Sequence, residues 1–294
     1  MPVVAVINRK GGSGKSTLAT QLAGYCASTG LRVMLGDVDP QQSSLAWLRR
    51  RVAQPTGCAA AIGGWAIEAA SMVRPPAGIT HVVLDTPAGM RGFELARVVA
   101  TADAILVPVC GSAFDRESAV DCLAELRAQP RVASGRCKVA LVGMRLDARG
   151  DADHELRRLA ARLHVPYLAG VRESPVYLRG AEQGLTVFDP PLSKAHADLR
   201  QWQPITDWLL ASWRSAEAQA PRAARQPAGA SVRRPVAVPS TPRHEPADVL
   251  DSRLLGAPRR PRAAKPASEG SGLSFLRAMV RASARMFVAD GGKA

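Results

Sequence analysis

The sequence predicts an α/β fold built on a doubly wound, mostly parallel sheet. Short apolar runs of strand length recur through residues 1–214 and alternate with stretches of helical pattern. Several of these runs end in glycine or aspartate, where a parallel strand gives way to a ligand-binding loop. A chain of 294 residues can hold one large domain of this kind or two modest ones.

The first element is a buried strand at residues 3–7, followed by a glycine loop and a helical pattern from residue 17. The glycines allow backbone conformations that side chains forbid, so that N–H groups can surround an anion at the start of a helix. Lys15 would reach the β- and γ-phosphates of a nucleotide, and the Ser16 hydroxyl would coordinate Mg²⁺. The predicted nucleotide-binding residues are Lys10, Gly11, Gly12, Ser13, Gly14, Lys15, Ser16 and Thr17.

A second strand is predicted at residues 31–36, with Asp37 and Asp39 at its end and a helix at residues 44–51. Two carboxylates at alternate positions point the same way and lie at the sheet edge where ligands bind. Ser43 is a candidate N-cap for the helix. We interpret the three arginines at residues 49–51 as a solvated helix end.

The third motif is an apolar strand at residues 81–84 that leads into Asp85. A carboxylate at a strand tip beside a phosphate-binding loop can hold the metal of a nucleotide, often through water. Between the second and third motifs the pattern indicates a strand at residues 58–62 and a short helix at residues 65–73.

The remaining alternation completes the sheet. Strands are expected at residues 104–109, 138–143 and within 166–174, and helices at residues 91–100, 114–126, 151–163 and 194–213.

The run K-G-G-S-G-K-S resembles the deviant Walker A box of the ParA/MinD family of P-loop NTPases, and is closest to short ParA-like partition proteins. D-V-D-P-Q-Q-S at residues 37–43 and D-T-P-A-G at residues 85–89 are similar to two further boxes of that family, and residues 175–189 resemble a late segment. The resemblance covers residues 1–214. It implies ATP and Mg²⁺ as cofactors, with Ser16, Asp37 and Asp85 near the metal.

The resemblance also implies how hydrolysis works. Lys10 would reach the partner's phosphates across an ATP-sandwiched homodimer, and Asp39 would position the attacking water. Residues 86–89 would form a switch segment. Met144 and Arg145 stand where family members often place an adenine-contacting Asn.

Charge points to a polyanionic partner. The net charge is +14, which favours nucleic acid or an anionic membrane face; a solvated Arg-rich surface is the alternative. By resemblance, basic residues that contact DNA fall in the late part of the domain. The candidates are Arg172, Arg179, Lys194 and Arg200.

The composition changes near residue 215. Residues 215–271 are rich in Ala, Pro and Arg and predict a disordered linker. Residues 215–294 carry 14 Lys and Arg against 6 Asp and Glu, so this basic tail holds most of the excess charge. Residues 272–290 predict a terminal amphipathic helix, with apolar residues on one face and arginines on another. It could lie on a membrane, dock on a partner protein, or fold back on its own domain.

The five cysteines are dispersed and include no C-x-x-C pair. We therefore expect reduced core thiols in a cytoplasmic protein, and the pattern disfavours an iron–sulfur reductase. No signal peptide or long apolar run is found. The leading hypothesis is a nucleoid-associated ParA-type ATPase that binds non-specific DNA with ATP and positions a plasmid, chromosome region or protein cargo, stimulated by a ParB-like or adaptor protein. The alternative is a MinD-like membrane-surface switch.

Overall fold

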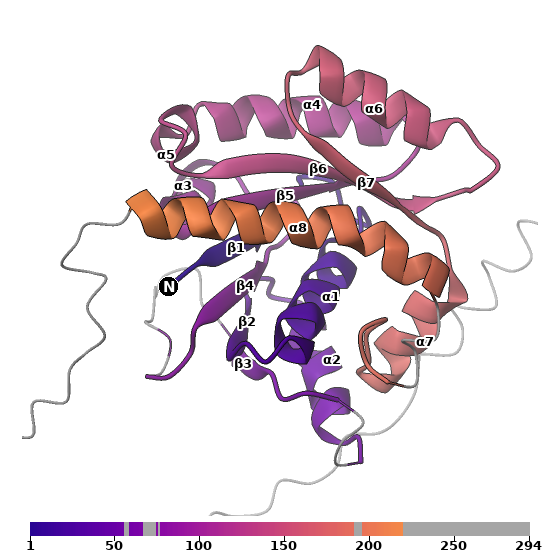
Figure 1. The fold of residues 1–294 in the computed structure, drawn as a ribbon. Helices are drawn as coiled ribbons and strands as arrows, with labels where there is room; N and C mark the ends of the chain where they lie inside the picture. Colours follow the sequence, from indigo (N-terminus) through magenta and orange to yellow (C-terminus); the bar gives the residue numbers. More distant parts are fainter. Residues whose placement is uncertain (56–58, 67–74, 76, 191–195, 220–294) are drawn as a thin grey trace, which may run out of the picture. The chain divides into compact units, whose positions relative to one another are not determined.

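Seven strands form one sheet in the order β3-β2-β4-β1-β5-β6-β7, and every pairing in it is parallel. The computed structural model describes residues 1–55, 59–66, 75, 77–190 and 196–219 (Figure 1), and the structural statements below concern these residues. They all lie within the first of two units into which the chain divides, Met1–Ser231.

The strands are short, and three of the seven are buried along their whole length. They are β1 (Val3–Val6), β2 (Val33–Asp37), β3 (Gly63–Ala66), β4 (His81–Asp85), β5 (Ala104–Val109), β6 (Lys138–Leu146) and β7 (Tyr167–Arg172). The helices are α1 (Lys15–Ser28), α2 (Ser43–Val52), α3 (Gly92–Thr101), α4 (Ala113–Arg127), α5 (Pro130–Ala133), α6 (Ala152–Arg162), α7 (Pro175–Gln183) and α8 (His196–Gln219).

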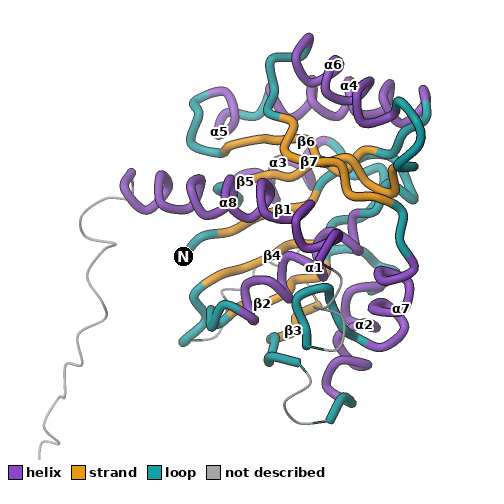
Figure 2. The backbone as a smooth tube through the Cα atoms, turned by 45° about the vertical axis from the view of Figure 1, so that its right-hand side comes forward, coloured by secondary structure: helices purple, strands orange, loops and turns teal. Residues whose placement is uncertain are grey.

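Helices cover both faces of the sheet (Figures 1 and 2). Side chains alternate along each strand, so that in β1 Val4 packs toward α1 and α8 while Val3 packs toward α3 and α4. The first apolar cluster joins the sheet to α1, α2 and α8, and the second joins it to α3, α4 and α6. Because helices cover both faces of the sheet, successive residues of its central strands are apolar.

The winding of the sheet changes direction at β1. From β1 the chain continues outward through β2 and β3 on one side, and later through β5, β6 and β7 on the other. Ligands in such sheets bind at the carboxyl ends of the strands beside this switch point. Asp37 and Asp85 are register partners at the ends of β2 and β4, next to the loop that follows β1.

The predicted α/β class is confirmed, but one region differs from the prediction. No strand forms at the described residues 59–62, and β3 begins instead at Gly63. Trp65 and Ala66, predicted to start a helix, belong to β3; the rest of that helix lies outside the described residues. β3 pairs with β2 and packs closely on α2, where a Cβ at Gly64 would lie 2.8 Å from Leu48.

Helix α8 continues through residues 215–219, beyond the boundary predicted at residue 214. Residues 220–294, which include most of the predicted linker and the whole terminal helix, lie outside the described part. Four cysteines, Cys26, Cys110, Cys122 and Cys137, are free and buried as expected, and Cys58 is not described. No helix in the described part combines the length and apolar character needed to cross a bilayer.

Candidate functional site

The glycine loop joins β1 to α1 at the switch point of the sheet. Gly12 and Gly14 have φ angles of 73° and 92°, in the left-handed region where a side chain is strained. Gly11 has no positive φ, so the expected freedom is used at two of the three glycines. Gly14 is the N-cap of α1, and a Cβ there would meet Met144 at 3.3 Å. The loop thus has a conformation in which the backbone N–H groups at the start of α1 can bind an anion.

Lys15 is buried at the first position of α1, with 7% of its surface exposed. Its ammonium donates to the carbonyl oxygen of Lys10 at 3.2 Å. Burial lowers the pKa of Lys15, although the charges of Asp85 and Asp39 act in the opposite direction. A phosphate next to this buried ammonium would offset the cost of its desolvation.

Lys10 contacts a helix of its own chain. Its ammonium lies 2.5 Å from Oδ1 of Asp115, at the N3 position of α4. Asp115 and Ser112 form a capping box that starts this helix. Burial would raise the pKa of Asp115, but hydrogen bonds from Lys10 and Ser112 hold it below its ordinary value.

Asp37 is buried and accepts three backbone hydrogen bonds. Its Oδ1 accepts from the amide of Asp39 at 3.0 Å, and its Oδ2 accepts from the amides of Ser44 and Leu45 at 3.0 and 3.1 Å. Burial nevertheless raises the pKa of Asp37. The predicted cap at Ser43 is wrong. Gln42, with φ 51°, is the N-cap without a side-chain bond, and the carboxylate of Asp37 satisfies the amides at the start of α2.

Asp85 is fully buried at the end of β4. Its Oδ2 accepts a 2.6 Å hydrogen bond from the Ser44 hydroxyl. Its Oδ1 has no hydrogen-bond partner among the described residues, although the Ser16 hydroxyl is close enough to favour the ionised form. Burial raises the pKa of Asp85 to about 6.

The donor set around Asp85 fits Mg²⁺. An unpaired carboxylate oxygen beside a serine hydroxyl offers the hard oxygen ligands that Mg²⁺ prefers. In the part of the chain that is described, no group of three His, Cys, Asp or Glu side chains could hold a metal by itself. That agrees with Mg²⁺, which takes most of its ligands from phosphates and water.

A cavity of about 670 Å³ opens over the glycine loop. Asp39 lines it and is held by its own turn, where its Oδ1 accepts from the amide of Gln41 at 2.9 Å. The predicted switch segment contributes Pro87 and Ala88. It is tied to the first strand and loop, because the Gly89 amide donates to the Arg9 carbonyl at 2.8 Å. The structure thus brings the three boxes together around one cavity.

Arg145 also lines this cavity, from the irregular end of β6. Its φ of 52° is left-handed, and its guanidinium donates to the carbonyl oxygen of Gly12 and to Sγ of Cys110. The sequence marked this position only as a departure from a resemblance. The structure shows that Arg145 holds the outer side of the glycine loop.

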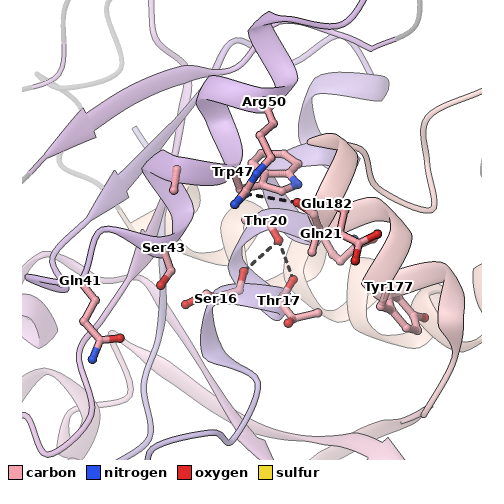
Figure 3. A pocket seen from close by; sticks show the side chains of 12 residues that line it. Ser16, Thr17, Thr20, Gln21, Gln41, Ser43, Trp47, Arg50, Tyr177 and Glu182 are labelled. Atoms are coloured by element: carbon pink, nitrogen blue, oxygen red, sulfur yellow. Dashed lines mark hydrogen bonds between the residues drawn. The ribbon is translucent and has the colours of Figure 1, made fainter. Parts of the chain in front are cut away.

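A second cavity of about 370 Å³ lies between α1, α2 and α7 (Figure 3). It shares Ser16, Thr17, Gln41 and Ser43 with the first cavity. Arg50 and Trp47 approach it from α2, and Tyr177 from α7. The two cavities therefore meet at the first residues of α1 and α2.

The late segment at residues 184–189 fastens α7 to α2. Gly184, with φ 70°, packs so closely on α2 that a Cβ would lie 2.2 Å from the Arg51 amide. Arg51 and Asp189 form a buried pair with two hydrogen bonds of 2.8 Å. The interpretation of residues 49–51 as a solvated helix end is therefore wrong for Arg51, which is only 4% exposed.

The four candidate DNA contacts differ in their surroundings. Arg172 makes two hydrogen bonds, of 2.8 and 2.9 Å, to the buried carboxylate of Asp198. Arg179 on α7 and Arg200 on α8 are exposed. Lys194 lies outside the described residues.

Comparison with known proteins assigns the family. Residues 4–240 match the CobQ/CobB/MinD/ParA nucleotide binding domain family. The chain is 31% identical over 218 residues to Maintenance of carboxysome distribution protein A of Gloeobacter kilaueensis, an alignment that covers 72% of this chain and 95% of that protein.

Solved structures support the fold. An ATP complex of a McdA variant from Cyanothece superposes with a TM-score of 0.53 at 16% identity, covering 73% of this chain and 96% of that one. MinD in the MinC:MinD cell division complex of Aquifex aeolicus gives a TM-score of 0.52 at 14% identity, covering 75% and 97%. The chain therefore belongs to the CobQ/CobB/MinD/ParA family, as a P-loop ATPase of the ParA/MinD type.

Proposed function

We propose that this protein is a partner-stimulated ParA-type ATPase that dimerises with ATP and positions a cargo on DNA. The observation that carries the proposal is the convergence on one cavity of the glycine loop, Lys15, Asp39 and the D-T-P-A-G segment, with Asp85 beside it. The alignment with a carboxysome-distribution protein covers almost the whole length of that protein, and this similarity supports a positioning role.

Each residue has a part in this proposal. The loop amides and Lys15 would bind the phosphates, and Ser16 and Asp85 would hold Mg²⁺, which supplies charge neutralisation when bound. Asp39 would orient the attacking water. Lys10 would leave Asp115 and reach the phosphates of a second copy, so that ATP closes the dimer.

Non-specific DNA is the proposed surface on which the dimer acts, inside the cytoplasm and on the nucleoid. The net charge of +14 supports contacts to phosphates, which give affinity without sequence preference. Arg179 and Arg200 are the exposed candidates in the described domain. Arg172 is committed to Asp198, so we assign it a smaller share of the contact. A ParB-like or adaptor protein would stimulate hydrolysis and release the DNA.

The test is DNA binding by the full-length protein with ATP, with ADP, and for Lys15→Ala, at several salt concentrations. Binding that requires ATP, disappears in Lys15→Ala and falls steeply with salt supports the proposal. Arg179→Ala with Arg200→Ala should weaken binding, whereas Arg136→Ala, an exposed arginine just before the amino end of β6, is the matched control.

Binding that ignores the nucleotide would contradict an ATP-gated DNA switch. ATP-dependent sedimentation with anionic vesicles, lost on deletion of residues 272–290, would instead favour the membrane-surface alternative.

A further inference from the structure

Ser44 connects the two buried carboxylates at the ends of β2 and β4. It is the second residue of α2 and is fully buried. Its amide donates to Oδ2 of Asp37 at 3.0 Å, and its hydroxyl donates to Oδ2 of Asp85 at 2.6 Å. One residue thus fixes the start of a helix to one carboxylate and the orientation of the other.

The two carboxylates differ in how many of their oxygens accept a hydrogen bond. Both oxygens of Asp37 accept backbone amides from the turn and from α2. Asp85 receives the Ser44 hydroxyl on one oxygen only, and its other oxygen stays buried without a hydrogen-bond partner in the described part. The Ser16 hydroxyl lies beside Asp85. Of the two, Asp85 therefore has the oxygen that is available to a cation.

We propose that Ser44 is a positioning residue for Mg²⁺: its hydroxyl holds Oδ2 of Asp85 and leaves Oδ1 available to the cation, while Asp37 anchors α2. The inference rests on the proposed nucleotide site, and deepens it. A side chain that orients a carboxylate ligand without touching the metal acts on metal affinity, typically by about 10-fold to 100-fold.

The geometry also connects Ser44 to the Asp39 turn, because Asp37 accepts hydrogen bonds from the amides of both Asp39 and Ser44. Residues 39–42 lie between Asp37 and α2, and Asp39 lines the phosphate cavity. A shift of this turn moves the first residues of α2, and with them the hydroxyl bound to Asp85.

The experiment measures nucleotide binding rather than turnover. Binding of a fluorescent ATP analogue by the full-length protein is followed first in EDTA and then during a Mg²⁺ titration. For Ser44→Ala we expect an apparent Mg²⁺ affinity about 10-fold weaker, with Mg²⁺-free nucleotide affinity unchanged. Ser44→Thr, which keeps a hydroxyl, should restore the Mg²⁺ affinity. Ser28→Ala, at the far end of α1, is the matched control.

Several results would overturn the inference. A Ser44→Ala protein with wild-type Mg²⁺ affinity removes the positioning role, as does equal loss of binding in EDTA and in Mg²⁺, which indicates a purely structural role. If Ser44→Ala does not fold, Ser44→Cys replaces it as the variant without a hydroxyl. Equal Mg²⁺ affinities of folded Ser44→Cys and Ser44→Thr would then contradict the hydroxyl's role. Wild-type protein that binds no nucleotide would overturn the proposed function itself.

Discussion

The ammonium of Lys10 lies 2.5 Å from Oδ1 of Asp115 within the same chain. The same carboxylate belongs to the capping box of α4, where its Oδ2 accepts from the amide and the hydroxyl of Ser112. In the proposed dimer Lys10 must leave this partner to reach the neighbouring copy. In that proposal the contact with Asp115 would compete with dimer closure.

Asp115→Asn is expected to favour ATP-dependent dimerisation, because it removes the charge that holds Lys10 in its own chain. The pair is open to solvent on the Lys10 side and closed on the Asp115 side. Solvent-screened pairs contribute up to about 1 kcal/mol, so the dimer affinity should rise about twofold to fivefold. Analytical ultracentrifugation with a slowly hydrolysed ATP analogue measures it. Ser112→Ala is the control, since it breaks the capping box and keeps the Lys10 contact. Equal effects of the two variants would contradict the competition.

Asp85 is predicted to destabilise the nucleotide-free protein at neutral pH. Burial raises its folded-state pKa from 3.8 to about 6, so the folded state binds a proton more tightly than the unfolded state. The contribution of Asp85 to the free energy of unfolding is therefore most favourable below pH 4. It falls by roughly 3 kcal/mol as the pH rises through about 6.

Asp85→Asn should abolish this loss, because the amide stays neutral and can still accept from Ser44. In EDTA at pH 7.5 we expect its Tm to exceed that of the wild type by on the order of 5–10 °C. The difference should shrink toward pH 4. A difference independent of pH would show that desolvation of Asp85 is not its cause.

The buried pair of Arg51 and Asp189 is expected to be essential for stability. Either Arg51→Ala or Asp189→Ala leaves an unpaired buried charge, which costs about 3–5 kcal/mol. Denaturant unfolding should show both losses, and the double variant should lose less than their sum. Arg49→Ala, exposed on the same helix, is the control and should change stability by less than about 0.5 kcal/mol. Additive losses would argue against direct pairing.

Local patterns predicted the strands that surround the site, because each is a short apolar run buried on both faces. β3 was missed because its G-G-W-A sequence has no such run. Its position depends on Gly64 lying against Leu48, a contact that no local pattern reveals.

The side-chain partners of the site were less predictable than its main residues. Ser44 and Arg51 depend on distant partners. Asp85 lies 41 positions after Ser44 in the sequence, and Asp189 lies 138 positions after Arg51. Asp115 carried a local signal, since S-x-x-D marks a capping box, but its contact with Lys10 is long-range. Burial made Arg51 the exception in a run of three arginines that looks uniform in sequence.

Arg145 offers a test that separates nucleotide binding from stability. Its guanidinium holds the Gly12 carbonyl of the phosphate loop, while its left-handed backbone is strained for a long side chain. Asn tolerates this conformation better than Arg does. We therefore expect Arg145→Asn to raise the free energy of unfolding by about 1 kcal/mol, yet to weaken binding of ATP and ADP about fivefold, since the loop loses a charge-assisted hydrogen bond that is partly exposed.

Two further variants assign these effects to their causes. Arg145→Lys keeps a cationic donor and the strain, so nucleotide affinity should partly recover without a gain in stability. Arg145→Gly removes both the cationic donor and the backbone strain, so its nucleotide affinity should fall as that of Arg145→Asn does. Fluorescent-nucleotide titration and denaturant unfolding give the two quantities on the same samples, with Arg149→Ala as the control. If Arg145 holds the loop through Gly12, nucleotide affinity should fall in Arg145→Asn while the free energy of unfolding rises. A change of both quantities in the same direction in every variant would show that Arg145 supports the fold and not the loop.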